Sequence, residues 1–567
     1  MFRTSGKLKF AQRRERQSQY RNAPRKTRMT RPASFDASSP TDRPNTVTVR
    51  EAVIDLMRQF GMTTVFANPG STELPLFRNF PSDFRYVLGL QEATVVGMAD
   101  GFAQATRNAS FVNLHSAAGV GNAMGNIFTA YKNRTPIVIT AGQQARSILP
   151  FDPFLASSQA TELPKPYVKW SIEPARAEDV PQAVARAYYL AMMPPRGPVL
   201  VSIPVDDWDQ SAQLIAPRMV STEIRPQPSV LDVIGTALDA SERPAMVVGG
   251  AVDRDHAWNQ VVALAERHNA RVWAAPMSGR CSFPEDHRLF AGFLPAMREK
   301  IVALLGGHDA IFAIGAPAFA YHIEGAGPHI PEGASLFQIT DDPDTAAWTP
   351  VGTTAVGSIR LGLEDLLARP ARSDRPEPPR RAPKPFVQPT APMTVAYALQ
   401  TLAEVREPND IVVEEAPSAR PIMQRYLPMT RSETFYTMDS GGLGYGMPAA
   451  VGIALAKRSA RVIGLIGDGS SLYSVQALWT AAQLKLPITF VILNNGRYAA
   501  LQDFAPVFGF SATDVVQGTD LPGLDFPALA TGMGCTARRV SQASELRDVL
   551  ARALASGTCN LVDIEVA

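Results

Sequence analysis

The sequence predicts an α/β protein with three domains, each built on a doubly wound parallel sheet. From Thr46 onward, short apolar runs alternate with helical patterns, as is typical of buried parallel strands connected by helices. The chain has 567 residues, which is enough for three or four domains of ordinary size. Residues 368–392 are dense in proline and charge, a composition typical of an exposed linker, and they separate the last domain from the others.

The first domain, 46–222, is expected to begin with the helix TVREAVIDLMRQFG, which ends at Gly61. Its strands are expected at TTVFANPG, YVLGL, ASFVNLHSAAG, TPIVITAGQ and GPVLVSIPVDDW. Ligands of such sheets bind at the carboxyl ends of the strands. The segments NPGS, QE, LHSAAG and AGQQ lie at such ends and mark a candidate binding site.

The other two domains repeat this alternation. The second domain, 223–367, has expected strands at RPAMVVGGAV, ARVWAAP, DAIFAIGA and SLFQITDD. The third domain, 393–567, has expected strands at DIVVEEA, ARVIGLIGDGS, PITFVILNNG and CNLVDIEVA.

The first 45 residues differ, because they are rich in Arg, Ser and Pro and lack the apolar segment of a secretory signal. A transit peptide, a disordered tail and an early start codon are the alternatives; we favour the last two and expect no part in catalysis.

Composition narrows the class of protein. The chain is 46% hydrophobic and 19% charged, which is typical of a globular protein with large cores. Its net charge of +2 gives no reason to expect nucleic acid or an acidic membrane as partner. The three cysteines show no metal-type spacing and fit a reducing compartment. The sequence contains no run of 18 apolar residues, the length needed to span a membrane. We therefore expect a cytoplasmic protein with neither nucleic-acid nor membrane partners.

The most specific motif lies in the third domain. One strand ends in Gly467-Asp468-Gly469, the helix SVQALWTAAQL follows, and the next strand ends in Asn494-Asn495-Gly496. A right-handed crossover brings the ends of two such strands together, so Asp468 and Asn495 are expected to be close. The glycines and the helix N-terminus suit a bulky anion, and the two side-chain oxygens suit Mg²⁺. The motif therefore predicts a site for a metal-bound diphosphate.

The spacing of this motif, GDG followed by 24 residues and then NN, resembles the thiamin-diphosphate signature of the 2-oxo acid decarboxylase and acetohydroxyacid synthase superfamily. It is not a Walker loop, because no Gly-Lys-Ser/Thr follows. The resemblance extends over nearly all of the chain after residue 46 and is strongest to the benzoylformate decarboxylases. The segments that carry it are NPGSTELPLFRNFPSDFRYVLGLQEATVVGMADGFAQAT, NLHSAAGVGNAMGN, TAGQQAR, GPVLVSIPVDDWD, IGAPAFAYH, GGLGYGMPAA and FPALA.

The resemblance implies the organisation of the protein. The first domain would be a pyrimidine-binding domain, the second a central domain without catalytic groups, and the third a diphosphate-binding domain. The cofactors would be thiamin diphosphate and Mg²⁺, or Ca²⁺ in its place, and no FAD is expected. Family members bind the cofactor between two subunits, so a homodimer or homotetramer is implied.

The resemblance also implies roles for single residues. Taken alone, Glu92 is interpreted as a carboxylate at the start of a helix. By the resemblance, Glu92 would bond the pyrimidine ring and share a proton with the ring. An apolar seat would raise the pKa of Glu92 for this role. Leu443, by itself an ordinary core residue, would keep the two cofactor rings folded together, and Gly441 would offer a carbonyl to the amino group. The remaining implied cofactor contacts are Ser418, Gly467, Asp468, Gly469, Ser470, Asn495 and Tyr498. The implied metal ligands are Asp468, Asn495 and the backbone carbonyl of Arg497.

Three more residues match positions that handle substrate. His115 and His322 match proton shuttles, a task that suits imidazole near neutral pH, and Ser71 matches the residue that holds the substrate carboxylate. Each has a simpler interpretation, since a strand-end His is often structural and Ser71 after Pro-Gly is a good helix N-cap. Three coincident matches favour function. The matching apolar pocket positions are Phe154, Leu155, Ala500, Leu501 and Phe504.

The loop after Glu415 departs from the family pattern, because Ala416 and Pro417 stand where hydroxyl residues are usual and Arg420 follows. Polar pocket groups decide specificity more sharply than methylenes do, so Arg420 and Asp503 leave benzoylformate itself in question.

The first functional hypothesis is non-oxidative decarboxylation of an aryl or bulky apolar 2-oxo acid to an aldehyde and CO₂, with carboligation as a side activity. The first alternative is a carboligase of the acetolactate synthase type; the second is a cofactor-binding regulator with a dead site. The two histidines favour aldehyde release over carboligation, since release requires that a proton be delivered. The presence of Glu92, Asp468 and Asn495 argues against a dead site.

Overall fold

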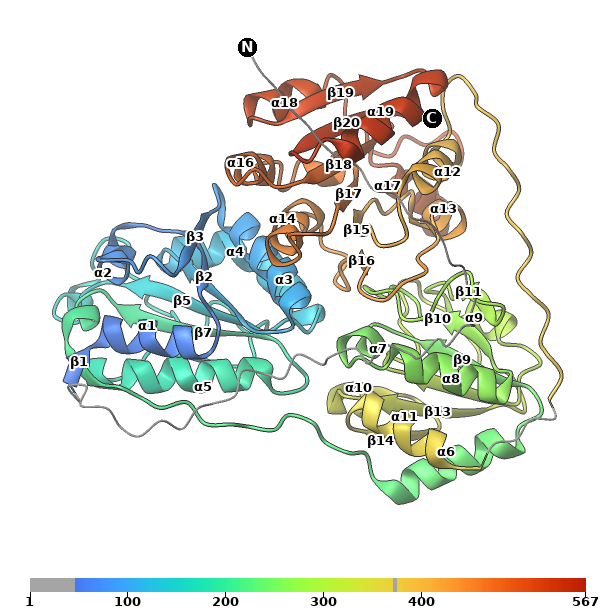
Figure 1. Ribbon diagram of the computed structural model, residues 1–567, viewed down its shortest axis with the longest axis horizontal. Coiled ribbons are helices and arrows are strands. Elements are labelled where there is room, and N and C mark those ends of the chain that lie inside the picture. Colours follow the sequence, from blue (N-terminus) through green and yellow to red (C-terminus); the bar gives the residue numbers. More distant parts are fainter. Residues whose placement is uncertain (1–45, 371–374) are drawn as a thin grey trace, which may run out of the picture. The chain divides into compact units, whose positions relative to one another are not determined.

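The computed structural model describes residues 46–370 and 375–567, and it contains three six-stranded parallel sheets (Figure 1). The predicted three-sheet α/β fold is therefore confirmed. The predicted leader, 1–45, lies outside the described residues. The three sheets fall within the predicted domain ranges 46–222, 223–367 and 393–567. None of the described helices is long and apolar enough to cross a membrane.

The first sheet has the strand order β3-β2-β4-β5-β7-β6, and every neighbouring pair is parallel. Its strands are β2 (Thr64–Asn68), β3 (Arg85–Leu88), β4 (Ser110–Leu114), β5 (Ile137–Gln143), β6 (Ser171–Ile172) and β7 (Pro198–Pro204). The expected strands are present, and the two-residue β6 adds an edge. The short strands β1 (Thr46–Thr48) and β8 (Ser211–Gln213) pair antiparallel outside this sheet.

Helices cover both faces of the first sheet. Alternate residues of each strand point to opposite faces, so neighbouring residues pack into different cores. On β2, Phe66 packs into the same core as α3 (Glu92–Thr106) and α4 (Ser116–Lys132). Its neighbour Val65 packs into a different core, with α1 (Val49–Gln59) and α5 (Val180–Met192). A sheet buried on both faces explains why its strands read as continuous apolar runs.

The second sheet has the order β11-β10-β9-β12-β13-β14. The four expected strands are β9 (Pro244–Val248), β10 (Arg271–Ala274), β12 (Ala310–Ile314) and β13 (Ser335–Thr340), and β11 (Phe290–Phe293) and β14 (Thr353–Val356) are additional edges. The third sheet has the order β16-β15-β17-β18-β20-β19. Its strands are β15 (Ile411–Glu415), β16 (Phe435–Tyr436), β17 (Val462–Gly467), β18 (Ile488–Asn494), β19 (Thr536–Val540) and β20 (Asn560–Glu565).

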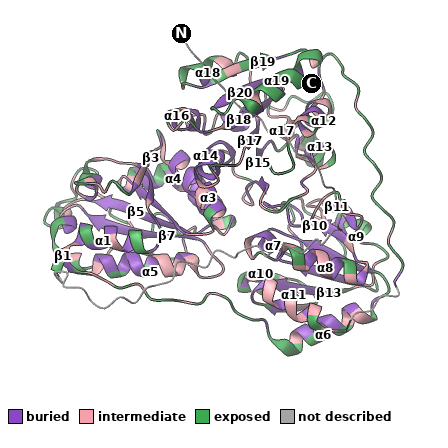
Figure 2. Ribbon diagram, viewed as in Figure 1, coloured by how far each residue is buried: buried purple, intermediate pink, exposed green. Residues whose placement is uncertain are grey.

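The first and third domains meet through two helices, α3 and α14 (Gly446–Ala456). Residues 446–455 of α14 are all buried, as Figure 2 shows by colour. Glycines permit the contact: a Cβ at Gly101 would overlap the backbone of Ala449, and one at Gly452 would overlap the carbonyl oxygen of Met98. The two helix backbones therefore touch directly.

The remaining helices cover the sheets or carry the loops at their edges. They are α2 (Leu74–Phe77), α6 (Pro228–Ala240), α7 (Ala251–Arg254), α8 (Trp258–His268), α9 (Arg298–Leu304), α10 (Pro343–Trp348), α11 (Ile359–Ala368), α12 (Val395–Val405), α13 (Arg420–Tyr426), α15 (Asp468–Ser471), α16 (Ala477–Gln483), α17 (Ala499–Phe504), α18 (Phe526–Gly532) and α19 (Ala543–Ala555). The 3-10 turns are η1 (Ser71–Glu73), η2 (Leu149–Phe151), η3 (Ala177–Asp179), η4 (Asp207–Asp209) and η5 (Ala505–Phe508).

Candidate active site

Glu92 is the first residue of α3 and lies at the carboxyl edge of the first sheet. Gln91 caps the helix by accepting the N–H of Thr94 at 3.1 Å. The half-buried carboxylate of Glu92 accepts one hydrogen bond from Asn68 Nδ2 at 3.2 Å and another from Asn122 Nδ2 at 3.1 Å. Two side-chain amides therefore hold the carboxylate in the single chain, and the expected apolar seat stays a prediction. The helix-start interpretation of Glu92 is confirmed, and its role toward a cofactor stays a prediction.

His115 lies at the same edge of the sheet, between the end of β4 and the start of α4. Its Nδ1 is 2.9 Å from Oε2 of Glu73 and 3.2 Å from Oγ1 of Thr72. Ser71 begins the 3-10 turn η1, to which both of these residues belong, and it is exposed. The structure therefore brings Ser71 and His115 to one place, and it adds Glu73, whose importance no sequence pattern had indicated.

Asp468 and Asn495 lie together in the third domain, as their spacing predicted. Oδ2 of Asp468 accepts the backbone N–H groups of Asn495 at 3.1 Å, Gly496 at 2.7 Å and Arg497 at 3.2 Å. Oδ1 accepts the N–H of Gly469 at 2.8 Å. Burial raises the pKa of Asp468 above its ordinary value, although these four N–H groups act in the opposite direction.

The strands β17 and β18 cause this arrangement, because Gly467 pairs with Leu493 and both strands end at one edge. The helix expected at 474–484 begins later, at Ala477, and the single turn α15 stands before it. Gly469 is required by a close approach, since a Cβ there would overlap the ring of Tyr498. The carboxylate of Asp468, the amide oxygen of Asn495 and the Arg497 carbonyl would make a donor set of the kind that Mg²⁺ or Ca²⁺ takes. That chemistry fits a metal-bound diphosphate.

Leu443 precedes α14 and is held by a residue that sequence reasoning did not single out. The buried carboxylate of Glu415, at the end of β15, accepts the N–H of Gly444 at 2.6 Å and also that of Gly446. Burial raises the pKa of Glu415 to about 7. Gly441 has a φ of +74° and nothing within 4 Å of its missing Cβ, so this turn has an open side. Glu415 thus ties the Leu443 turn to the third sheet.

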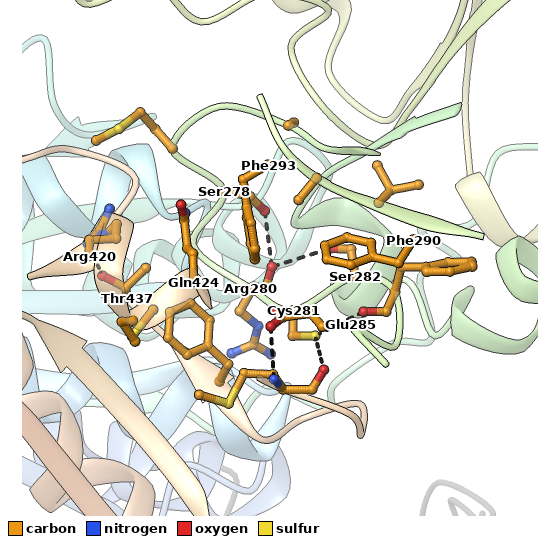
Figure 3. Close-up of a pocket in the computed structure, with 18 residues that line it drawn as sticks. Ser278, Arg280, Cys281, Ser282, Glu285, Phe290, Phe293, Arg420, Gln424 and Thr437 are labelled. Atoms are coloured by element: carbon orange, nitrogen blue, oxygen red, sulfur yellow. Dashed lines mark hydrogen bonds between the residues drawn. The ribbon is translucent and has the colours of Figure 1, made fainter. Parts of the chain in front are cut away.

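Arg420 was expected to place a polar group in the substrate pocket, but the structure gives it other partners. Its guanidinium bonds the buried carboxylate of Glu414, with a closest approach of 2.6 Å, and the hydroxyl of Thr437 at 2.6 Å. It lines a cavity of about 40 Å³ between the second and third domains, which is lined also by Arg280, Cys281 and others (Figure 3). None of the predicted catalytic residues lines this cavity. Ser418, nearby in the same loop, is half-buried.

His322 is an exposed residue of the second domain, and its ring contacts the edge of Phe504 on α17. The ring centroids are 5.0 Å apart and the planes are nearly perpendicular, at 88°. Phe504 is one of the predicted pocket residues. The structure therefore places one of the two predicted proton shuttles beside the predicted apolar pocket. Asp503, the neighbour of Phe504, is exposed.

The predicted site residues form two groups within the chain. The first group is Ser71, Glu92 and His115 in the first domain; the second is His322, Leu443, Asp468, Asn495 and Phe504. Across residues 46–370 and 375–567, no hydrogen bond or ion pair joins a member of one group to a member of the other. The predicted pocket residues Phe154 and Leu501 are 87% and 54% exposed.

The chain matches three domains of one enzyme family. Residues 47–161 match the N-terminal TPP binding domain of the thiamine pyrophosphate enzymes, residues 231–366 match the central domain, and residues 418–564 match the C-terminal TPP binding domain. Thiamine pyrophosphate is another name for thiamin diphosphate. Each range falls within a different one of the three domains and contains most strands of its sheet.

Curated relatives of two kinds align with nearly the whole chain. Benzoylformate decarboxylase of Pseudomonas aeruginosa is 45% identical over 528 residues, which cover 91% of this chain and 98% of the relative. Acetolactate synthase isozyme 3 large subunit of Escherichia coli is 28% identical over 536 residues, which cover 89% of this chain and 92% of the relative.

Two solved structures show the same fold throughout. Benzoylformate decarboxylase from Polynucleobacter necessarius has a TM-score of 0.89 and 42% identity, covering 92% of this chain and 98% of that one. The thiamine diphosphate-dependent 4-hydroxybenzoylformate decarboxylase of Rhodococcus jostii has a TM-score of 0.88 and 40% identity, covering 92% and 99%. The chain therefore belongs to the thiamine pyrophosphate enzymes, as a carboxy-lyase in the branch that contains the benzoylformate decarboxylases.

Proposed function

We propose that this protein decarboxylates an aryl 2-oxo acid, benzoylformate or a ring-substituted analogue, to the aromatic aldehyde and CO₂ without oxidation. The observation that carries this proposal is the gathering of Glu92, Ser71 and His115 at one sheet edge, in a chain 45% identical to a benzoylformate decarboxylase. The ion pair between Arg420 and Glu414 also supports this proposal. Because Glu414 binds the guanidinium, Arg420 is no longer a polar group that argues against benzoylformate as substrate.

The cofactor, thiamin diphosphate, would supply a carbon nucleophile that also accepts the electron pair left when CO₂ departs. Asp468, Asn495 and the Arg497 carbonyl would hold its diphosphate through Mg²⁺ or Ca²⁺. Glu92 would hold a proton at the pyrimidine ring nitrogen, with Asn68 and Asn122 keeping its carboxylate in place. Leu443 would orient the cofactor from the turn that Glu415 holds.

The substrate would be handled by the other residues of the two groups. The hydroxyl of Ser71 would bind the substrate carboxylate, and the imidazoles of His115 and His322 would deliver and remove protons near neutral pH. Phe154, Leu155, Ala500, Leu501 and Phe504 would surround the aryl group and exclude water. The edge contact between His322 and Phe504 supports this division, because it sets a proton carrier beside an apolar wall.

A second copy of the chain would complete each site. Two observations support this: the residues separate into two groups within one chain, and Phe154 is 87% exposed although its predicted role is to line a pocket. Ser71, Glu92 and His115 of one protomer would face Asp468, Leu443 and His322 of its partner, in a homodimer or homotetramer. We place this enzyme in the cytoplasm.

The test is product analysis with a panel of 2-oxo acids in the presence of thiamin diphosphate and Mg²⁺. Benzoylformate and 4-hydroxybenzoylformate should yield the matching aldehyde and one equivalent of CO₂, and pyruvate should react much more slowly. A protein that forms no aldehyde from aryl or branched oxo acids, but converts pyruvate to acetolactate, would be a carboligase of the acetolactate synthase type.

A further inference from the structure

We infer that Glu73 is a positioning residue for His115. Its carboxylate fixes the tautomer and the orientation of the imidazole, so that Nδ1 carries the hydrogen and Nε2 is the nitrogen that exchanges a proton with the substrate. This inference rests on the proposed function, in which His115 moves a proton. Glu73 itself would touch neither substrate nor cofactor.

The carboxylate of Glu73 is buried and fully engaged. The residue is 1% exposed. Oε2 accepts the N–H of Gly70 at 2.7 Å and lies 2.9 Å from Nδ1 of His115, and Oε1 accepts the hydroxyl of Thr72 at 2.6 Å. A buried carboxylate is stable only when donors surround it, and these three donors meet that requirement.

The surroundings of Nδ1 decide the tautomer of His115. Both atoms near it are oxygens: Oε2 of Glu73 at 2.9 Å and Oγ1 of Thr72 at 3.2 Å. The single hydrogen of the Thr72 hydroxyl is donated to Oε1 of Glu73, the nearer acceptor, so toward His115 the hydroxyl can only accept. Since both neighbours are acceptors, Nδ1 must be the donor. In a neutral imidazole the other nitrogen, Nε2, is then free to accept a proton.

Two glycines lie against Glu73 and His115 and leave room for them. A Cβ at Gly70 would overlap the ring of His115 at Nδ1, and a Cβ at Gly142 on β5 would overlap Oε1 of Glu73. The backbone therefore lies directly against the imidazole on one side and the carboxylate on the other. The His115 side chain remains 18% exposed, and its Nδ1 faces the buried carboxylate of Glu73. His115 lies at the same sheet end as Ser71 and Glu92.

Groups that neighbour His115 and Glu73 lie in η1 and on β3. Glu73 in η1 is the charged group that contacts His115 directly. Tyr86 on β3 faces the same carboxylate: burial raises the pKa of Tyr86 to about 12, and the charge of Glu73 adds to that shift. Thr72 contributes a neutral hydroxyl. Replacing Glu73 should therefore act mainly on His115.

The test compares Glu73→Gln and Glu73→Asp with the control Asp207→Asn in the holoenzyme. Asp207 is an equally buried carboxylate of the same domain, but it bonds Arg146 at 2.8 Å and has no contact with His115. Glu73→Gln should lower kcat for benzoylformate by about 10- to 100-fold, by analogy with the loss of a group that orients a metal-ligating histidine. KM and the Kd for thiamin diphosphate should change less than about threefold, and Glu73→Asp should restore part of kcat. Asp207→Asn should lower Tm, but it should not lower kcat selectively while KM stays nearly unchanged.

A measurement that does not depend on turnover separates an effect on the orientation of His115 from an effect on folding. Carbethoxylation of His115 by diethyl pyrocarbonate, followed by mass spectrometry, reports the fraction of unprotonated imidazole at each pH in the apoenzyme and the holoenzyme. In Glu73→Gln the midpoint of this modification should change, because His115 loses the carboxylate that it bonds. In Asp207→Asn the midpoint should stay where it is in the natural protein.

The outcomes distinguish this inference from the proposed function. If His115→Ala lowers kcat but Glu73→Gln keeps kcat within about threefold and leaves the midpoint unchanged, the positioning role of Glu73 is wrong and the proposed function stands. If His115→Ala itself leaves kcat unchanged, the proton-transfer role in the proposed function fails. If Glu73→Gln and Asp207→Asn lose kcat and Tm in parallel with no shift in midpoint, Glu73 is merely structural.

Discussion

Gly452 of α14 lies against the backbone of Met98 in α3, so closely that a Cβ at Gly452 would overlap the Met98 carbonyl oxygen. This contact ties the third domain to the helix whose first residue is Glu92. Glu92 therefore owes its place to a packing contact six residues farther along its helix, in addition to its own hydrogen bonds.

We expect Gly452→Ala to destabilise the protein, because the added methyl group must separate two helix backbones. Overpacking of this kind lowers the free energy of unfolding by about 1–3 kcal/mol, which thermal unfolding would register as a fall in Tm of several degrees. The control is Gly532→Ala in α18, where nothing lies within 4 Å of the missing Cβ. That change should leave Tm unchanged or raise it. Equal losses in both variants would contradict the packing argument.

Replacing Glu92 by Gln should lower kcat by at least about 100-fold, because an amide cannot hold the proton that the pyrimidine ring requires. One of the two asparagine amides can still donate to the amide oxygen, and the other can turn its own oxygen toward the new NH2 group, so the fold should remain intact. Aldehyde formation from benzoylformate measures the first effect, and circular dichroism with Tm measures the second. Near-normal turnover in this variant would rule out the proposed role of Glu92.

Metal removal should abolish activity, and either Mg²⁺ or Ca²⁺ should restore it, because the proposed ligands are all oxygens. Asp468→Asn should weaken binding of thiamin diphosphate by about 100-fold, since the only carboxylate of the donor set is lost. Isothermal titration with and without Mg²⁺ measures both effects. The prediction fails if the EDTA-treated enzyme keeps its activity, or if Asp468→Asn binds the cofactor as the natural protein does.

Glu433 should make stability depend on pH in the acid range. Burial alone would raise the pKa of Glu433, but the hydrogen bond from Lys457 and the charge of Arg107 outweigh it and lower the pKa from 4.5 to about 2. A depressed carboxyl pKa stabilises the folded state above the unfolded value, and that contribution is lost as the pH falls from about 4.5 towards 2.

Glu433→Gln should therefore lower the free energy of unfolding by about 1–3 kcal/mol at pH 7, because it leaves Arg107 and Lys457 without their shared carboxylate. The difference from the natural protein should shrink steadily below pH 4.5. Denaturant unfolding at a series of pH values measures this directly. A difference that stays constant from pH 7 to pH 3 would contradict the prediction.

The sequence by itself determined the three parallel sheets. Strands covered on both faces are largely apolar, so β4, β5, β12 and β18 stand out as runs without reference to their neighbours. It likewise determined that Asp468 and Asn495 meet, because one crossover joins their strands and parallel strands end at the same edge. The edge strands β6, β11, β14, β16 and β19 escaped prediction, because an edge strand need not be apolar on both faces and so carries less pattern.

Only the tertiary structure decided the partners of the charged side chains. Arg420 turns from the expected pocket to Glu414, and Glu73 bonds a histidine 42 residues farther along the chain. No spacing rule joins such pairs, because strand order and the room left by Gly70 and Gly142 determine which side chains meet. The sequence could thus predict the place of the site, since strand ends follow from local pattern. The hydrogen bonds within it depend on atoms brought together from distant segments, so only the folded chain reveals them.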